Sequence, residues 1–222
     1  MTSLSFRVRE LWIDAKAVAA VEFAIVVPFM LLLYVGGVEL SKAMAINVKV
    51  TATSHSVADM ITQNTQVSAA QLQTILGASA KIIAPYPTTD SAGNSLITVT
   101  VSEVSTDGGG NATVQWSQSY NGVSFGTGRP VGQPIILPSS LTGGAQNTQN
   151  NNISLILGEV AYAYTPNLGY TIAGTVTLHD SYYLFPRCST NSPANSSFPY
   201  YDVKLTTSTT CTCIQHLQQK TC

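Results

Sequence analysis

Charged side chains are scarce in this chain of 222 residues. They make up 9% of it, and 10 Lys and Arg stand against 11 Asp and Glu, which gives a formal net charge of −1. Proteins that bind nucleic acid normally carry a large basic field, so we expect no nucleic-acid partner. Beyond residue 50 the chain has five basic and seven acidic side chains. Ser, Thr, Asn and Gln must therefore keep this part soluble, as is common in extracytoplasmic proteins.

Histidine is also rare, and the motifs of common catalytic sites are missing. The three histidines are His55, His179 and His216. His179 and Asp180 are neighbours on an expected strand, where successive side chains face opposite sides, so they cannot form a local base–orienter pair. No GxSxG, HExxH or phosphate-binding glycine loop occurs. We therefore expect no enzyme activity, no catalytic residues and no cofactor.

The few cysteines all lie late in the chain, at Cys188, Cys211, Cys213 and Cys222. The CxxC spacing of zinc sites is absent, so we expect no metal site. A Cys211–Cys213 bond would close a very tight ring, and we therefore favour Cys188 pairing with one of these two and Cys222 with the other. Such structural disulfides need an oxidising compartment. Four free thiols in a cytosolic domain are the alternative.

One long apolar run, residues 17–38, dominates the sequence, and Glu22 is its one charged residue. A helix of this length, at about 1.5 Å per residue, covers roughly the hydrocarbon thickness of a bilayer. A cleaved secretory signal usually has a shorter apolar core followed by a small-x-small site. Here the run passes into helix-like sequence without a turn. We therefore predict a retained transmembrane helix over residues 18–38, with the lipid bilayer as a partner.

Glu22 has two interpretations, because a carboxylate inside a membrane span is costly and often functional. In the first, Glu22 lies near the cytoplasmic interface, where water reaches it. In the second, cleavage between Ala17 and Val18 creates an α-amine four residues, about one helical turn, before Glu22. The two charges could then neutralise each other within one subunit or between neighbours.

The stretch AVAAVEFAIVVPFMLLLYVGGVELSKA resembles the N-terminus of TadE/TadG-like proteins, the minor pilins (pseudopilins) of the tight-adherence Flp pilus system. The later EVAYAYTP and LFPR blocks and the Val-Gln-Trp-Ser segment resemble their exterior domain. The resemblance thus covers roughly residues 17–187. It implies a prepilin-peptidase site before Val18, followed by Glu22 and Phe23, and a helix that packs into a filament core. Ala17 stands where the usual pattern has glycine.

The predicted fold is α+β and pilin-like: a long membrane-spanning helix, a short helix and an extracytoplasmic antiparallel β-sheet domain. We place a leader or cytoplasmic segment at 1–17, a membrane-proximal helical region at 39–80, the β domain at 81–187 and a disulfide-containing tail at 188–222. Ser68 and Gln71 form a capping-box pattern before a short helix with Gly77 as its stop. Residues 96–117 predict a hairpin, and residues 121–152 a loop.

Along the long helix, one apolar-biased seam continues outward from the span at steps of three and four. It consists of Ala43, Ile46, Val50, Thr53, Val57 and Met60. Extended backwards into the span, the same seam meets Glu39, Gly36, Leu32, Phe29, Ile25 and Glu22. Its outer half is expected to pack against the domain of the same chain, and its inner half, within the span, against other subunits.

Arg7, Arg9 and Lys16 precede the span and favour a cytoplasmic N-terminus, while Lys42 and Lys49 follow the span and weaken this asymmetry. Paired late cysteines would decide the orientation, with the N-terminus inside and the bulk of the chain outside. The resemblance then implies a single-pass protein of the bacterial inner membrane, with its C-terminal domain periplasmic or exposed in a pilus. Its partners would be other pilin and minor pilin subunits, the pilus assembly machinery and prepilin peptidase.

Two functions remain open from the sequence. The first is a non-enzymatic minor pilin that primes, caps or assists assembly of a Flp pilus. The second is a membrane-tethered extracytoplasmic binding or adhesion module that does not enter a filament. In the second, tyrosines would supply the recognition surface; the candidates are Tyr162, Tyr164, Tyr182, Tyr183, Tyr200 and Tyr201.

Overall fold

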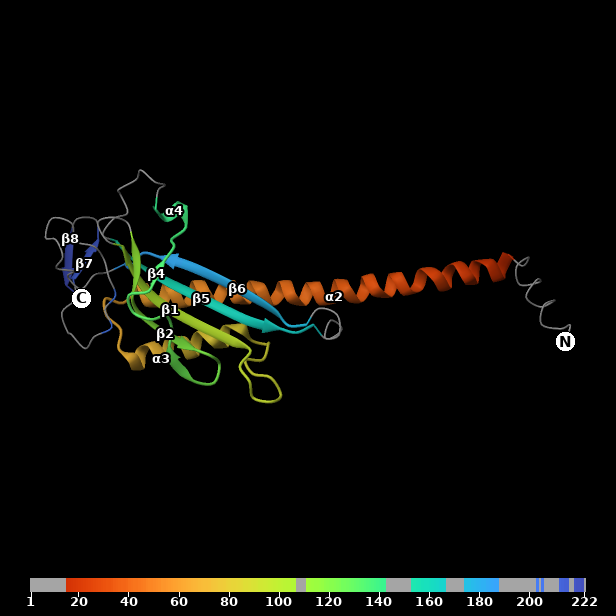
Figure 1. Cartoon of the computed structure of the whole chain (residues 1–222), viewed down its shortest axis with the longest axis horizontal. Helices are drawn as coiled ribbons and strands as arrows, with labels where there is room; N and C mark the ends of the chain where they lie inside the picture. The colour runs from red at the N-terminus through yellow and green to blue at the C-terminus, as the bar shows by residue number, and fades with distance from the viewer. Residues whose placement is uncertain are drawn as a thin grey trace.

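A single helix of 48 residues, α2 (Ala15–Thr62), forms the long axis of the molecule and projects far beyond the domain that packs on its other end (Figure 1). The computed structural model describes residues 15–106, 111–142, 153–166, 174–187, 203, 205, 212–215 and 218–221. After α2 come a short helix, α3 (Ala69–Ser79), a 3₁₀ turn, η1 (Ala80–Ile83), and an antiparallel sheet. The α+β class with a long apolar N-terminal helix is therefore confirmed.

The sheet is antiparallel in every described pairing, and its strands run in the order β3-β2-β1-β5-β6, with β4 paired to β2 beside this path. Its strands are β1 (Ile97–Thr106), β2 (Ala112–Tyr120), β3 (Phe125–Thr127), β4 (Pro134–Ile135), β5 (Ser154–Tyr164) and β6 (Val176–Leu184). A separate ladder joins β7 (Thr212–Gln215) to β8 (Gln218–Thr221), and α4 (Ser139–Thr142) is a single helical turn.

The predicted hairpin is present as β1 and β2. The prediction of a loop over residues 121–152 was wrong in part, because β3 and β4 both pair with β2 and extend the sheet there. Strands this short carry too little alternation to be recognised from the sequence.

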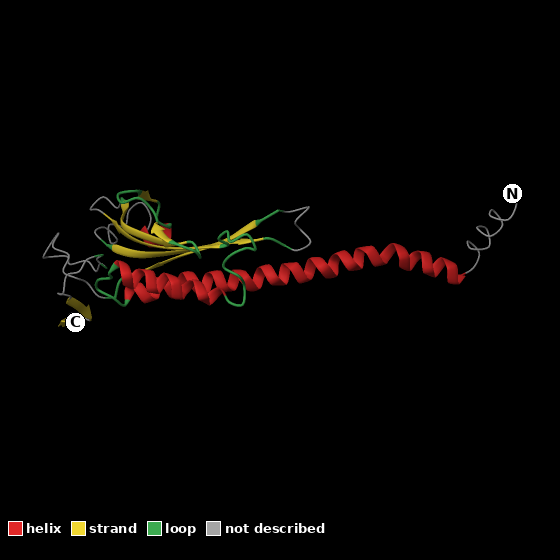
Figure 2. Cartoon of the chain, turned by 90° about the horizontal axis from the view of Figure 1, so that it is seen from below, coloured by secondary structure: helices red, strands yellow, loops and turns green. Residues whose placement is uncertain are grey.

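The outer half of α2 lies along one face of the sheet, and α3 lies on the same face (Figure 2). The helix contributes Ile46, Val50, Val57 and Ile61 to the main core, all essentially without solvent contact. The helix packs mainly on β5 and β6, and it meets alternate residues of these strands, because only every second side chain of a strand points toward the helix. The outer half of the predicted seam therefore packs within its own domain.

Gly158 on β5 marks the closest approach of the sheet to α2. A Cβ atom at this position would lie 2.6 Å from the carbonyl oxygen of Ser54 and 2.9 Å from a methyl group of Val57. Since real Cβ atoms do not approach other atoms so closely, glycine is required for the sheet to lie flat against the helix.

The start of α3 matches the prediction. The Ser68 side chain accepts a hydrogen bond from the Gln71 backbone, and the Gln71 side chain accepts one from the Ser68 backbone. The predicted stop at Gly77 was wrong, since α3 continues to Ser79 and then into η1. A glycine inside a helix costs about 1 kcal/mol relative to alanine. Burying the Ile83 side chain, at the end of η1, stabilises the fold by more than this.

Where α2 ends, the C-terminal part of the chain joins the main core through Val203. The indole nitrogen of Trp116 donates a 2.7 Å hydrogen bond to the Val203 carbonyl. The buried Glu103 carboxylate accepts hydrogen bonds from Ser154 Oγ at 2.7 Å and from the Val203 backbone N–H at 3.2 Å. Because a buried carboxylate needs hydrogen-bond donors, these two contacts hold β1, β5 and the chain at Val203 in one relative position.

Candidate functional site

The residues of the predicted processing site lie in the first turns of α2. Ala17 and Val18 are both helical, and the helix runs through the bond between them without a break. Val18, Glu22 and Phe23 have exposed side chains. Glu22 follows Val18 by four residues, so the two lie on one face of the helix. The predicted relation between a new amine at Val18 and the Glu22 carboxylate is therefore geometrically available.

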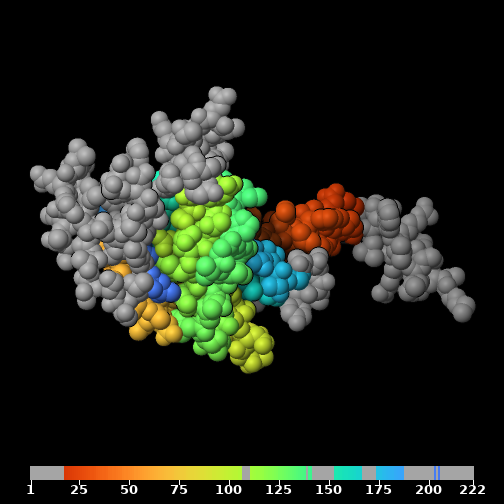
Figure 3. All heavy atoms as spheres, turned by 60° about the vertical axis from the view of Figure 1, so that its left-hand side comes forward, coloured from red at the N-terminus to blue at the C-terminus, as the bar shows by residue number. Residues whose placement is uncertain are grey.

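No hydrogen bond or ion pair joins Glu22 to another described residue. Around it, the apolar side chains from Val18 to Val38 form a surface with no described segment packed over it, and the space-filling view shows this part of α2 standing clear of the domain (Figure 3). A core helix of a soluble protein of this composition would be mostly buried, whereas none of the most apolar window is. This surface fits a single-pass membrane anchor.

The same helix also carries the domain. α2 continues from the apolar segment to Thr62 without a boundary, and its outer turns are part of the main core. A signal sequence removed after translocation would not include the segment on which the sheet packs. The apolar segment and the segment that carries the domain are therefore parts of one continuous helix.

Glu39 ties the sheet to α2 at the point where the apolar segment ends. Its carboxylate accepts a 2.6 Å hydrogen bond from the Tyr164 hydroxyl, and Lys42 Nζ lies 3.4 Å from it. Burial first, and then the hydrogen bond to Glu39, raise the pKa of Tyr164 to about 12. Two residues earlier on β5, the Tyr162 hydroxyl donates to the carbonyl of Pro87.

A second tie lies at the far end of α2. The Arg187 guanidinium forms an ion pair with Asp59, and the Arg187 backbone N–H donates to the Thr62 carbonyl at 2.9 Å. Tyr164 belongs to the EVAYAYTP block and Arg187 to the LFPR block. Each block therefore fixes one end of the β5–β6 pair to α2.

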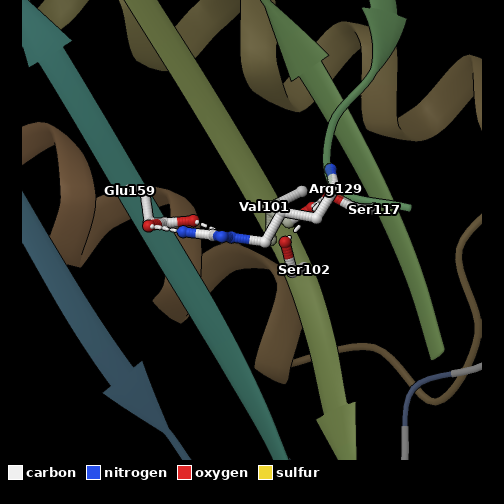
Figure 4. Close-up of polar contacts among 5 residues, drawn as sticks. All are labelled: Val101, Ser102, Ser117, Arg129 and Glu159. Carbon is white, nitrogen blue, oxygen red and sulfur yellow. Dashed lines mark hydrogen bonds and ion pairs between the residues drawn. The ribbon is translucent and has the colours of Figure 1, made fainter. Parts of the chain in front are cut away.

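The face of the sheet that points away from α2 carries a polar cluster (Figure 4). Arg129, in the segment after β3, reaches across β1 and makes a two-pronged ion pair with Glu159 on β5, with distances of 2.9 Å from Nε and 2.6 Å from Nη2. The pKa of Arg129 is raised by this hydrogen bond. Below it, Ser117 Oγ accepts the Arg129 backbone N–H at 2.9 Å and lies 2.8 Å from Ser102 Oγ.

His179 lies at the edge of a hollow of about 340 Å³ beside this ion pair. Asp180 points to the opposite face, where it accepts a 2.5 Å hydrogen bond from Ser54, so the expectation that His179 and Asp180 face opposite sides is confirmed. His55 stacks on the Tyr182 ring at a centroid distance of 3.6 Å. Among the described residues, no group of three or more His, Cys, Asp or Glu side chains could hold a metal ion.

The tyrosines predicted for a recognition surface make contacts within the fold where the structure describes them. Tyr162 is buried, Tyr164 is tied to Glu39, Tyr182 stacks on His55, and Tyr183 packs against the smaller cluster on the other face. Tyr200 and Tyr201 lie outside the described residues.

The disulfide prediction cannot be placed on the fold. Cys188, Cys211 and Cys222 lie outside the described residues, and of Cys213 only the backbone, in β7, is described.

Sequence reasoning missed three contacts that hold the site together: Glu39 with Tyr164, Arg129 with Glu159, and Trp116 with Val203. Only the first left a usable signal, because Glu39 is the first charge after the apolar run and Tyr164 belongs to a block already singled out. The other two join residues far apart in sequence, and no periodicity marks them.

One protein-family model matches the chain, over a segment that includes the bare apolar part of α2. Residues 17–59 match the sequence model of the family described as TadE-like protein. The matched range contains most of α2, including Val18 and Glu22, and stops before α3 and the sheet. The resemblance noted in the N-terminal sequence is confirmed over this range, and it associates the chain with the Tad pilus system. Comparisons with curated proteins and with solved structures gave no match.

Proposed function

We propose that this chain, with its TadE-like helix, is a membrane-anchored minor pilin that takes part in assembling a Flp-type pilus as a priming, capping or accessory subunit. It has no enzymatic role in this proposal and acts through its surfaces. The domain lies on the periplasmic side of the bacterial inner membrane or is exposed in a pilus, and the N-terminus is cytoplasmic. Prepilin peptidase acting before Val18 would supply the amine that meets Glu22.

One observation carries the proposal: the bare apolar surface of α2 continues past the end of the predicted span. Leu40, Met44 and Val48 follow one another at steps of four and are 61%, 62% and 67% exposed. They lie on the side of the helix opposite the main core. We call these three residues the free stripe.

The free stripe lies beyond the reach of the hydrocarbon. The predicted span ends at Val38, and Val48 is ten residues, about 15 Å, further along the helix axis. Apolar side chains in a row at helical spacing normally pack on something. A neighbouring helix can cover the span and the free stripe together, whereas lipid alone covers only the span. This favours lateral packing against another subunit.

Glu22 lies on the same side of α2 as the free stripe, because Leu40 follows it by 18 residues, about five full turns. The predicted seam, which joined Glu22 to Ile46, drifts round the helix by about a third of a turn over this length. Helical spacing links it through Val26, Phe29 and Leu33 to Leu40. An unpaired carboxylate in lipid favours any arrangement in which a neighbour neutralises it. Glu22 would therefore set the register between two such helices, while the free stripe supplies contact area.

The adhesion alternative is weaker, because its tyrosines are occupied within the fold where the structure describes them. Tyr164 and Tyr182, for example, bind Glu39 and His55 of the chain's own long helix. We therefore do not advance it as a second function.

A test compares two valines in the pilus-producing host. Val48→Lys places a charge in the free stripe. Val131→Lys makes the same change at a position 75% exposed on the sheet side, away from α2. Both variants should insert and fold, since neither side chain is buried.

We expect Val48→Lys to lower the amount of the chain that copurifies with sheared pili by about tenfold, as loss of a central interface residue does, and Val131→Lys to leave it unchanged. Equal incorporation of both variants would contradict the proposal. N-terminal sequencing of the membrane-purified chain adds an independent readout: a start at Val18 supports pilin-type processing, and a start at Met1 or Thr2 supports a permanent anchor.

A further inference from the structure

A hollow of about 640 Å³ lies where α2 leaves the domain. Its walls are mostly apolar and include Leu33, Tyr34, Gly37, Val38 and Lys42 of the helix together with Tyr86 of the loop after η1. Gly37 leaves the floor open, since nothing lies within 4 Å of the place where its Cβ would be. The hollow begins beside the free stripe, since Leu33 and Gly37 lie on the same side of α2 as Leu40 and Met44, and it extends round the helix to Val38, Lys42 and Tyr86.

The position of the hollow along α2 corresponds to the surface of a bilayer. Lys42 lies four residues beyond Val38, so about 6 Å outside the predicted span. This is the level of the headgroup phosphates when residues 18–38 fill the hydrocarbon. Tyr34 and Tyr86 bring two amphipathic rings to the same level, where tyrosine is enriched in membrane proteins.

Lys42 supplies the charge that a phosphate requires. One of its three N–H donors faces Glu39 Oε1 at 3.4 Å, and the Glu39 carboxylate is also engaged by the Tyr164 hydroxyl at 2.6 Å. Its side chain is close to half exposed, and it opens onto the hollow. An ammonium placed above an apolar wall complements a phosphate attached to acyl chains.

Lys42 distinguishes the occupant of the hollow from that of the free stripe. A neighbouring helix that packs on the free stripe would bring apolar side chains to this side of α2 and offer no further anion to the Lys42 ammonium. A phospholipid offers a phosphate at the level of Lys42 and acyl chains along the apolar wall below it.

We propose that this hollow binds one phospholipid from the leaflet on the domain side of the bilayer. Its phosphate meets Lys42, and the first carbons of its acyl chains lie along Leu33, Gly37 and Val38. This rests on the transmembrane part of the proposed function. Because the domain is packed rigidly on α2, the bound lipid fixes the depth of the chain in the membrane, and so the level at which the free stripe leaves it.

Native mass spectrometry of the full chain in detergent tests the site. The probes are a short-chain phosphatidylglycerol, a diacylglycerol with the same acyl chains, and inorganic phosphate. Lys42→Gln removes the charge. Lys49→Gln is the matched control, two helical turns further out on the same side of α2. Gly37→Leu fills the floor of the hollow and has room to fold.

We expect the wild-type chain to retain one phosphatidylglycerol, with much weaker binding of diacylglycerol and of inorganic phosphate. Lys42→Gln and Gly37→Leu should each weaken retention by about tenfold, the loss expected for one charge-assisted contact, and Lys49→Gln should retain the lipid as the wild type does. Equal retention by Lys42→Gln and wild type would overturn the proposal, as would binding of inorganic phosphate as tight as that of the lipid. A second protein chain retained through Gly37 in place of lipid would also overturn it. The pilus assay on Val48→Lys does not depend on this result, so the two proposals can fail separately.

Discussion

The two halves of α2 belong to one unbroken helix, but they differ in what covers them. Between residues 46 and 62 the large apolar side chains other than Val48 pack against the sheet and α3, and Val50, Val57 and Ile61 have no solvent contact. Between residues 18 and 45 the equally apolar Phe23, Leu32 and their neighbours are bare. The outer half finds its partners within the chain, whereas most of the inner half is covered by no described residue, as fits a membrane anchor.

Sequence pattern explains the difference. The outer half mixes Ser, Thr, Asn and Lys with its apolar residues, which leaves a single stripe for the core. The inner half is apolar on every side as far as Val38, with Glu22 as the one charged residue of this stretch, and Glu39 and Lys42 follow it. A helix that is apolar all round is suited to lipid, whereas one with a stripe is suited to a sheet. The free stripe is the exception, since it continues the apolar character outward on the side away from the core.

The largest difference in the free energy of unfolding should come from truncating an aliphatic side chain to alanine in each of the two halves. Ile61→Ala leaves a cavity in the main core and should lower the free energy of unfolding of the domain by about 2–5 kcal/mol. Leu32→Ala, at a side chain 70% exposed in the isolated chain, should leave it unchanged. Urea unfolding of the full chain in detergent, followed by near-UV circular dichroism, measures both.

Comparable losses in both variants would show that the inner half packs on the domain after all. No loss in Ile61→Ala would show that the outer half is not held by the sheet. Either result would remove the contrast between the two halves.

How much of this could be predicted depends on whether the signal was local. Four predicted features rest on patterns within a few helical turns or one turn motif, and each is present. They are the long apolar helix, its continuation to about Thr62, the capping box at Ser68 and the hairpin of β1 and β2. The α+β class follows from them. The short strands β3 and β4 and the extension of α3 past Gly77 were missed, because they form only when β2 and the main core are already in place.

The candidate site divides in the same way. Val18 and Glu22 could be singled out because one carboxylate in an apolar run is conspicuous. The free stripe and the hollow at Lys42 could not, since both depend on which side of α2 the sheet covers. The predicted seam assigned Ile46 to the domain side, but it gave no role to Leu40, and only the fold shows that Leu40 is bare.

A smaller effect on the domain, with a large one on assembly, is expected at Glu22. Glu22→Ala removes a charge that no described residue of the chain neutralises, so insertion and domain stability should be unchanged or slightly improved. Incorporation into sheared pili should fall, because the register between neighbouring helices loses its carboxylate. Glu22→Asp keeps the charge and should restore part of the incorporation. Normal pilus incorporation of Glu22→Ala would remove Glu22 from the assembly surface.

The smallest predicted effect lies at the junction between the two halves. Tyr164→Phe removes the hydroxyl that binds Glu39 and should lower the free energy of unfolding at neutral pH by about 0.5–1.5 kcal/mol. Tyr182→Phe is the control, because it removes a hydroxyl while keeping the ring that stacks on His55. Urea unfolding at neutral pH compares the two variants directly.

The pH dependence sharpens this comparison. The pKa of Tyr164 is about 12 in the folded chain, against an ordinary value of 10.0. Between these two values the folded chain holds a proton that the unfolded chain has released, so the contribution of Tyr164 is fully present below pH 10 and is lost as the pH rises toward 12. Tyr162 and Tyr183 also have raised pKa values, because both are buried, so all variants should lose stability in alkali. Tyr164→Phe should lose less than the wild type and less than Tyr182→Phe. Identical alkaline profiles in all three proteins would mean that Glu39 does not hold the sheet to the helix at the membrane surface, and that the boundary between the bare and buried halves of α2 is set by apolar packing alone.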